Sequence, residues 1–250
     1  RAEAHIAYLR KRGFSPSTVK KFGIGASLDY HSLPSYLLAQ GYTPEECVES
    51  GACARTDEGR LIDSEGERLI IPIINHMDEV VAFGGRLLKN ADRAKYKNTR
   101  ETMLFNKSKT LYNINLVKKE KRAGGLASLI MVEGYMDAIS LYEAGFRGVV
   151  ASMGTSLTKE QARLAKRYTE NVFISYDGDF AGQKANLRGL EILKQEGLKV
   201  RVVPMPDGMD PDDVVQKLGA EGYRECLGKA MPLIDFRLFA AKRKYDLAKT

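Results

Sequence analysis

The sequence has no tryptophan, only three histidines and only three cysteines. Cys47, Cys53 and Cys226 are far apart and form no CxxC pair, which argues against both a disulfide framework and a zinc site. A reducing, cytoplasmic environment is the expectation that follows. No apolar run approaches the roughly 18 to 20 residues that a membrane-spanning helix needs. A transmembrane protein is therefore excluded, and no membrane partner is expected.

Charge is distributed unevenly along the chain. The 250 residues include 39 lysines and arginines against 32 acidic residues, a net charge of +7. The stretch from Arg86 to Arg122 contains twelve basic and three acidic residues, a net of +9, which leaves −2 for the remainder. A basic excess confined to one segment is typical of a surface that binds a polyanion. On charge alone, a solvated surface loop remains an alternative.

The hydrophobic pattern changes at about residue 124. Before it, the clearest β signal is a predicted hairpin, with strands at 69–74 and 80–83 joined by a polar turn. After it, short apolar runs alternate with amphipathic helices, which indicates a parallel sheet covered on both faces. The ligand crevice of such a sheet lies beyond the carboxyl ends of its strands. The predicted strands of this sheet are residues 129–132, 149–151, 172–176 and 200–203.

The predicted fold class is therefore α/β. We expect a mixed α/β amino-terminal subdomain at residues 1–123 that carries the basic segment. A Rossmann-like domain with a mostly parallel sheet should follow at residues 124–230, and residues 231–250 should begin a helical subdomain.

Three groups of acidic residues follow strands of the predicted parallel sheet. Glu133 ends the first strand, Asp177 and Asp179 follow the third, and Asp210 and Asp212 come shortly after the fourth. Because the carboxyl ends of parallel strands share one edge, we expect these carboxylates to face a common crevice. Carboxylates packed together acquire raised pKa values unless cations neutralise them. Oxygen ligands without His or Cys favour Mg²⁺ or Mn²⁺, ions that suit phosphoryl or nucleotidyl transfer.

Each acidic group also has an ordinary interpretation. Asp-Gly-Asp is a common turn sequence, Asp210 could cap a helix that begins near Asp212, and Glu133 could be a solvated carboxylate at a strand end. Three independent groups at three strand ends nevertheless favour a metal site. Glu133 is in addition placed to serve as a general acid or base.

Several segments resemble bacterial DnaG-type primases. Residues 133–137 (EGYMD), 176–182 (YDGDFAG) and 207–212 (DGMDPD) resemble the TOPRIM domain of these enzymes. The acidic residues of these segments are shared with topoisomerases and some nucleases.

A second set of segments makes the resemblance specific to primases. Residues 83–86 (FGGR), 95–102 (KYKNTRET) and 105–112 (FNKSKTLY) resemble the basic motif of the primase RNA polymerase core. Residues 8–14 (YLRKRGF) resemble the amino-terminal part of that core. The resemblance covers nearly the whole chain.

The resemblance implies a DNA-directed RNA polymerase of the primosome that makes short RNA primers on a single-stranded DNA template for replication. It implies that Glu133, Asp177 and Asp179 are catalytic and hold Mg²⁺ or Mn²⁺. Asp210 and Asp212 would contribute to further metal binding, and Asp137 would be a supporting acid at the rim. The implied nucleotide- or template-binding residues are Arg86, Lys95, Asn98, Lys107 and Arg12.

The implied partners are the single-stranded DNA template, NTPs and the RNA primer, with the protein a monomer at the cytoplasmic nucleoid. A replicative helicase would bind through a carboxyl-terminal module that this sequence does not contain. The family's amino-terminal zinc-binding module is also missing, so zinc is not expected in this fragment. Because position 1 is Arg rather than Met, we expect the numbering to begin inside a longer chain, as an excised catalytic core would.

One segment departs from the family pattern. Residues 63–67 (DSEGE) are acidic where the family usually carries an aromatic and basic stretch before Arg68, so one basic contact is expected to be lost. Two other functions remain open. One is a TOPRIM-type nuclease or topoisomerase-like phosphodiester enzyme, and the other is a non-catalytic module that binds single strands or guanine-nucleotide effectors.

Overall fold

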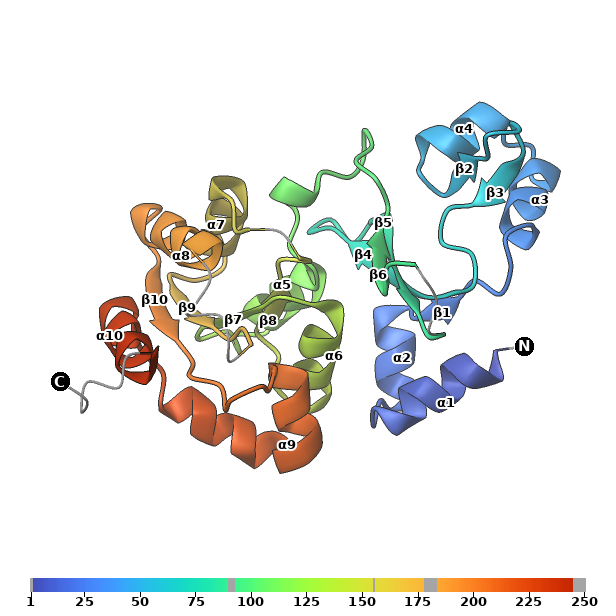
Figure 1. The fold of residues 1–250 in the computed structure, drawn as a ribbon. Coiled ribbons are helices and arrows are strands. Elements are labelled where there is room, and N and C mark those ends of the chain that lie inside the picture. Colours follow the sequence, from blue (N-terminus) through green and yellow to red (C-terminus); the bar gives the residue numbers. More distant parts are fainter. Residues whose placement is uncertain (1, 90–92, 155, 178–183, 245–250) are drawn as a thin grey trace. The chain divides into compact units, whose positions relative to one another are not determined.

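The computed structural model describes residues 2–89, 93–154, 156–177 and 184–244. The chain forms two compact units, residues 1–106 and residues 107–250 (Figure 1). No helix in the described ranges is long and apolar enough to cross a membrane.

The first unit contains a four-stranded antiparallel sheet. Its strand order is β1 (Gly25–Ala26), β4 (Arg68–Ile74), β5 (Val80–Leu87) and β6 (Tyr96–Asn98). The predicted hairpin is confirmed as β4 and β5, and β5 continues through the FGGR segment. Pro72 is tolerated in β4 because its partner Phe83 directs its backbone N and O towards Thr99, so this pair has no ladder hydrogen bond to lose.

Helices and a small hairpin complete the first unit. Helix α2 begins after Ser15, whose hydroxyl accepts a hydrogen bond from the Thr18 N–H, and it ends at Gly23 with φ 64°. Thr43 and Glu46 form a reciprocal capping box at the start of α4. The elements are α1 (Glu3–Lys11), α2 (Pro16–Phe22), α3 (Ser32–Ala39), α4 (Pro44–Glu49), β2 (Cys53–Arg55) and β3 (Leu61–Asp63).

The second unit contains a five-stranded, mostly parallel sheet, which confirms the predicted fold class. The strand order is β11-β10-β9-β7-β8, and only the β10–β11 pair is antiparallel. The strands are β7 (Leu129–Val132), β8 (Val149–Ala151), β9 (Asn171–Ile174), β10 (Lys199–Val202) and β11 (Met231–Pro232).

Helices cover the sheet of the second unit. Side chains of α5, α7, α8 and α10 share one core with Leu129 and Met131 of β7, while α6 packs against α9 (Figure 1). All four residues of β7 are buried, as expected for a central parallel strand. The elements are η1 (Lys107–Lys109), α5 (Ile114–Arg122), α6 (Tyr135–Glu143), α7 (Lys159–Lys166), α8 (Lys184–Gln195), α9 (Pro211–Gly228) and α10 (Leu233–Lys244).

Residues 107–123 pack with the second unit, since Leu111, Ile114 and Val117 belong to its core. The two compact units are defined by packing, and they divide the chain between residues 106 and 107. The domain boundaries at 123 and 230 are drawn on sequence motifs and stay predictions.

Candidate metal and nucleic-acid site

Acidic side chains from three segments gather at the carboxyl edge of the second unit's sheet. Glu133 directly follows β7, Asp177 lies shortly after β9, and Asp210 precedes α9. Burial raises the pKa of Glu133, and the negative charges of Asp177 and Asp210 raise it further. Both aspartates therefore lie near enough to Glu133 for their charges to act on its carboxylate.

The backbone of Glu133 is held in place by the segment after β8. The Met153 N–H donates to the Glu133 carbonyl at 2.9 Å, and the Ser152 N–H donates to the Val132 carbonyl at 3.1 Å. Met153 has a φ of 64°, a left-handed conformation that is uncommon for a residue other than glycine. This contact extends the alignment of β7 and β8 to the residue that carries the candidate acid.

Asp137 and Asp212 connect the acidic segments. Asp137 Oδ2 accepts a hydrogen bond from the Gly134 N–H at 3.1 Å, and its Oδ1 accepts one from the Asp212 N–H at 3.3 Å. Asp212 is only 5% exposed, and its Oδ1 accepts a hydrogen bond from Ser140 Oγ of α6. Asp137 thus links the start of α6 to the start of α9 by hydrogen bonds. The Asp212 carboxylate is buried and bonded to Ser140.

Asp210 has two roles in this arrangement. Its Oδ1 accepts a hydrogen bond from the Asp213 N–H at 2.7 Å, so it caps α9, and the cap interpretation is confirmed. Its charge also raises the pKa of Glu133, which shows that capping and membership of the acidic group are compatible.

The carboxylate group fits a hard divalent cation by its chemistry. Its members offer only oxygen ligands, and a cation would relieve the repulsion that raises the pKa of Glu133. Asp179 lies outside the described residues. Within the described ranges, no three His, Cys, Asp or Glu side chains converge closely enough to hold a metal ion.

The first unit carries a stack of arginine and tyrosine side chains. Arg86 of β5 is 7% exposed, and its guanidinium carbon lies 4.8 Å from the ring centre of Tyr8 and 4.8 Å from that of Tyr96. The guanidinium carbon of Arg12 lies 5.2 Å from the same Tyr8 ring. Asn98 is on the Arg86 face of the sheet, because Arg86 pairs with Tyr96 and Gly84 with Asn98. Three of the predicted binding residues therefore share one surface.

Sequence reasoning missed Tyr8 and left Tyr96 outside the site. The spacing of Tyr8 and Arg12, four residues apart in one helical segment, is a signal that could have joined them. Tyr112, at the end of the FNKSKTLY segment, is buried. Its ring packs edge-on against Tyr135 at 4.9 Å.

The remaining predicted cations lie elsewhere. Lys95 is exposed in the first unit. Lys107 is half-buried in η1 of the second unit, where burial lowers the pKa of its amine.

The acidic segment at 63–67 faces the interior of the first unit. Asp63 accepts hydrogen bonds from Ser27 Oγ at 2.6 Å and from the Glu65 N–H at 2.7 Å. Lys97, on the opposite face of β6 from Tyr96, donates to the Ser64 carbonyl at 2.5 Å. Asp63 and Glu65 therefore form an internal acidic cluster, and the loss of a basic contact relative to the family stays a prediction.

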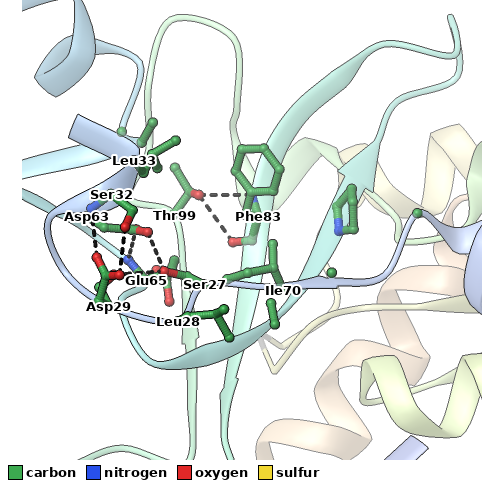
Figure 2. Close-up of a pocket in the computed structure, with 16 residues that line it drawn as sticks. Ser27, Leu28, Asp29, Ser32, Leu33, Asp63, Glu65, Ile70, Phe83 and Thr99 are labelled. Carbon is green, nitrogen blue, oxygen red and sulfur yellow. Dashed lines mark hydrogen bonds between the residues drawn. The ribbon is translucent and has the colours of Figure 1, made fainter. Parts of the chain in front are cut away.

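A pocket of about 550 Å³ lies beside this cluster (Figure 2). Ile70 and Phe83 form part of its wall, and Glu65 reaches it from the acidic segment. These residues are on the sheet face that also includes Gly85, since Ile70 pairs with Gly85. A Cβ at Gly85 would overlap Glu65 Oε2, so this glycine makes room for the carboxylate.

Comparison with known proteins gives two family matches. Residues 1–118 match the amino-terminal domain of the DNA primase catalytic core, and residues 130–215 match the Toprim-like family. A DNA primase of Clostridium acetobutylicum is 40% identical over 241 residues, which are 96% of this chain and 40% of that protein. A DNA primase of Deinococcus radiodurans is 37% identical over 97% of this chain and 42% of its own length. The chain thus spans about two fifths of the curated relatives that it matches.

Solved structures agree with these matches. The RNA polymerase domain of Mycobacterium tuberculosis primase DnaG is 31% identical, with a TM-score of 0.85, over 96% of this chain and 80% of that one. The E. coli primase catalytic core is 35% identical, with a TM-score of 0.84, over 99% of this chain and 80% of that one. A DnaG primase catalytic domain bound to single-stranded DNA is 34% identical, with a TM-score of 0.84, over 99% of this chain and 78% of that one. Since an amino-terminal primase domain and a Toprim-like domain follow each other along this fold, the chain belongs to the family of DnaG-type DNA primase catalytic cores.

Proposed function

We propose that this chain is a DNA-directed RNA polymerase core that synthesises short RNA primers on single-stranded DNA by divalent-metal-assisted nucleotidyl transfer. The observation that carries the proposal is that Glu133, Asp177 and Asp210 follow strands at one edge of the sheet, where the charges of both aspartates raise the pKa of Glu133. The same chain carries the stacked arginines of the first unit. The nuclease or topoisomerase-like alternative shares the acids, but it has no use for a primase-type basic motif.

We assign metal binding to Glu133, Asp177 and Asp210 together with Asp179, and a positioning role to Asp137 and Asp212. Bound there, Mg²⁺ or Mn²⁺ would supply Lewis-acid polarisation of a phosphate and would lower the pKa of an attacking hydroxyl. A Glu133 oxygen that the metal leaves free could accept the proton of the primer's 3′-hydroxyl. Asp137 supports this by holding the segments after β7 and before α9 together.

The basic residues are proposed to bind nucleotide or template phosphates. The planar guanidinium groups of Arg86 and Arg12 are held by aromatic rings, which suits forked hydrogen bonding to phosphate oxygens. Asn98 adds an amide on the same sheet face, and Lys95 and Lys107 add point charges. Phosphate contacts of this kind fix the register of the nucleic acid without reading its bases.

The partners of the whole protein follow as proposals from the family. They are the single-stranded template, NTPs, the RNA primer, and a replicative helicase that binds through a carboxyl-terminal module. We propose a monomer that acts at the cytoplasmic nucleoid as part of the replication machinery.

The test is primer synthesis from labelled NTPs on a single-stranded template, with and without Mg²⁺ and with a separately supplied zinc-binding module. Asp177→Asn should reduce synthesis at least about a hundredfold, because metal-bound charge stabilisation is the main catalytic contribution expected here. The matched control Asp57→Asn changes an exposed turn acid of the first unit and should leave the rate unchanged. Far-UV circular dichroism checks that both variants fold.

Two outcomes would contradict the proposal. Degradation of labelled template without NTP incorporation would favour the nuclease alternative. A wild-type rate from Asp177→Asn would remove the acidic edge from the mechanism. Binding of DNA that survives metal chelation while activity is lost would instead count against a non-catalytic binding module.

A further inference from the structure

The turn η1 presents Lys107 at the beginning of the second unit. The side chain is half-buried, and burial lowers the pKa of its amine. A lysine side chain has high rotamer entropy, so its orientation depends on how firmly its backbone is held. The hydrogen bonds that fix η1 therefore matter for the proposed role of Lys107.

Helix α7 begins with a capping box directly beside this turn. Thr158 Oγ1 accepts a hydrogen bond from the Gln161 N–H at 3.1 Å. In return, Gln161 Oε1 accepts one from the Thr158 N–H at 3.3 Å. These two bonds satisfy donors that the first turn of a helix leaves without partners, and either Glu or Gln at the third position can make them.

The donors that the capping box does not use are directed at η1. Gln161 Nε2 donates to the Lys107 carbonyl at 3.2 Å and to the Thr110 carbonyl at 3.0 Å. The Thr158 hydroxyl donates to the Ser108 carbonyl at 2.5 Å. Gln161 is 0% exposed, so no water competes for these bonds. Glutamate would complete the cap but has no N–H groups for the two carbonyls, which explains glutamine at this position.

We infer that Gln161 is a positioning residue for Lys107, holding η1 so that the lysine amine stays directed at the phosphate it binds. The inference rests on the proposed role of Lys107. It adds that a buried amide of α7, far from Lys107 in the sequence, sets the geometry of that contact.

The central variants are Gln161→Glu and Gln161→Met. Gln161→Glu keeps the acceptor for the Thr158 N–H and loses both donors to η1, whereas Gln161→Met loses all three bonds. In both, we expect the KM for NTPs or the Kd for template to rise about tenfold, the effect of losing buried hydrogen bonds, while kcat falls less. Gln195→Glu, at an exposed glutamine that ends α8, is the matched control and should change neither constant.

The titration of the Lys107 amine distinguishes a loss of overall folding from a loss of lysine positioning. After reductive ¹³C-methylation, its NMR titration reports the local environment without any activity measurement. In Gln161→Met, which adds no charge beside the turn, we expect the lowered pKa of Lys107 to return towards its ordinary value, while the thermal unfolding midpoint identifies variants that remain folded. A Lys107 titration unchanged from wild type in a folded variant would overturn the inference.

A double-mutant cycle with Lys107→Ala completes the test. If Gln161 acts through Lys107, Gln161→Glu should have no further effect on KM or Kd in the Lys107→Ala background. Fully additive effects would overturn the inference and leave the proposed function intact. If Lys107→Ala alone changes nothing, the role of Lys107 fails, and the inference fails with it. The Asp177→Asn result then still decides the proposed function separately.

Discussion

Replacing Glu65 by glutamine tests how the first unit accommodates its internal acidic segment. Glu65 is 4% exposed, and in the described part of the chain neither carboxylate oxygen has a hydrogen-bond partner. The nearest cations are Arg68, with Nε 3.8 Å from Oε2, and Lys97, with Nζ 4.0 Å from Oε1. Burial raises the pKa of Glu65 to about 7, against the lowering influence of Lys97 and Arg68, while Asp63 raises it further. The carboxylate is thus held where its charged form is poorly stabilised.

The expected magnitude follows from linkage. Glu65 ionises near 4.5 in an unfolded chain and near 7 in the folded protein. At about 1.36 kcal/mol for each pH unit, this difference corresponds to about 3 kcal/mol. Below pH 4.5 both states are protonated and the full stability is present. As the pH rises to 7, only the unfolded state releases its proton, so the free energy of unfolding falls, and above 7 the whole contribution is lost.

Glu65→Gln removes this titration and should flatten the pH dependence of stability between pH 5 and 8. At pH 8 we expect the variant to be more stable than wild type by up to about 3 kcal/mol, less what the ion pairs with Arg68 and Lys97 contribute. Urea unfolding followed by tyrosine fluorescence at pH 5, 6, 7 and 8 measures the difference.

Glu67→Gln is the matched control, two residues away. The Glu67 side chain is 34% exposed and pairs with Arg93 at 3.0 Å, so its loss should change stability by about 1 kcal/mol or less at every pH. The reasoning is refuted if Glu65→Gln and wild type lose stability in parallel as the pH rises. A variant less stable than wild type at pH 8 would refute it equally.

Two further predictions concern the FGGR segment. Gly85→Ala should reduce the free energy of unfolding by about 1–3 kcal/mol in urea titrations, because its Cβ would overlap Glu65 Oε2 and Arg68 Cδ. Adding Glu65→Ala should remove part of this loss, since the overlap with Arg68 remains, and an undiminished loss would contradict the overlap with Glu65. Arg86→Lys keeps the charge but loses the stacking of a planar group over two rings, so affinity for a single-stranded oligonucleotide should fall roughly fivefold in fluorescence anisotropy. The slope of log affinity against log salt should stay the same, whereas a reduced slope would show that a phosphate contact had been lost.

The parallel sheet of the second unit could be predicted because its strands β7 and β8 are buried on both faces. Burial of this kind leaves continuous apolar runs such as 129–132. Thr158 marks the start of α7, the helix after β8, by its side chain. Helix α3 could not be found in this way. Tyr36 is 61% exposed and Leu38 is exposed as well, so its apolar residues do not form one buried stripe. The three-residue strands β2 and β3 are too short to give a periodic signal.

The place of the acidic residues in the fold could be predicted where chain topology alone decides it, while their role stays a prediction. Glu133, Asp177 and Asp210 follow strands of one sheet, so the strand-end rule brings them together. The engagement of Asp212 depends on Ser140, which comes from a different helix and gives no local sequence signal. That hydrogen bond arises from the packing of α6 against α9 and could be seen only in the folded structure.

Neighbouring residues of the FGGR segment have different roles because they face opposite sides of β5. Read along the sequence, its glycines and arginine form one basic element. In β5, successive side chains point to opposite faces, so Gly85 accommodates Glu65 while Arg86 stacks on the other side. A single motif therefore has a structural role on one face and the proposed phosphate-binding role on the other.

Several basic residues of the stretch from Arg86 to Arg122 make contacts within the first unit. Between Arg86 and Arg122, Arg93 pairs with Glu67, and the Lys97 amine donates to a carbonyl of the acidic segment. Arg100 donates to the Val48 carbonyl at 2.7 Å. Cations engaged in this way stabilise the first unit and are less available to phosphates. The proposed polyanion-binding surface is therefore smaller than twelve basic residues suggest, and we propose that it is centred on the arginines that contact tyrosine rings.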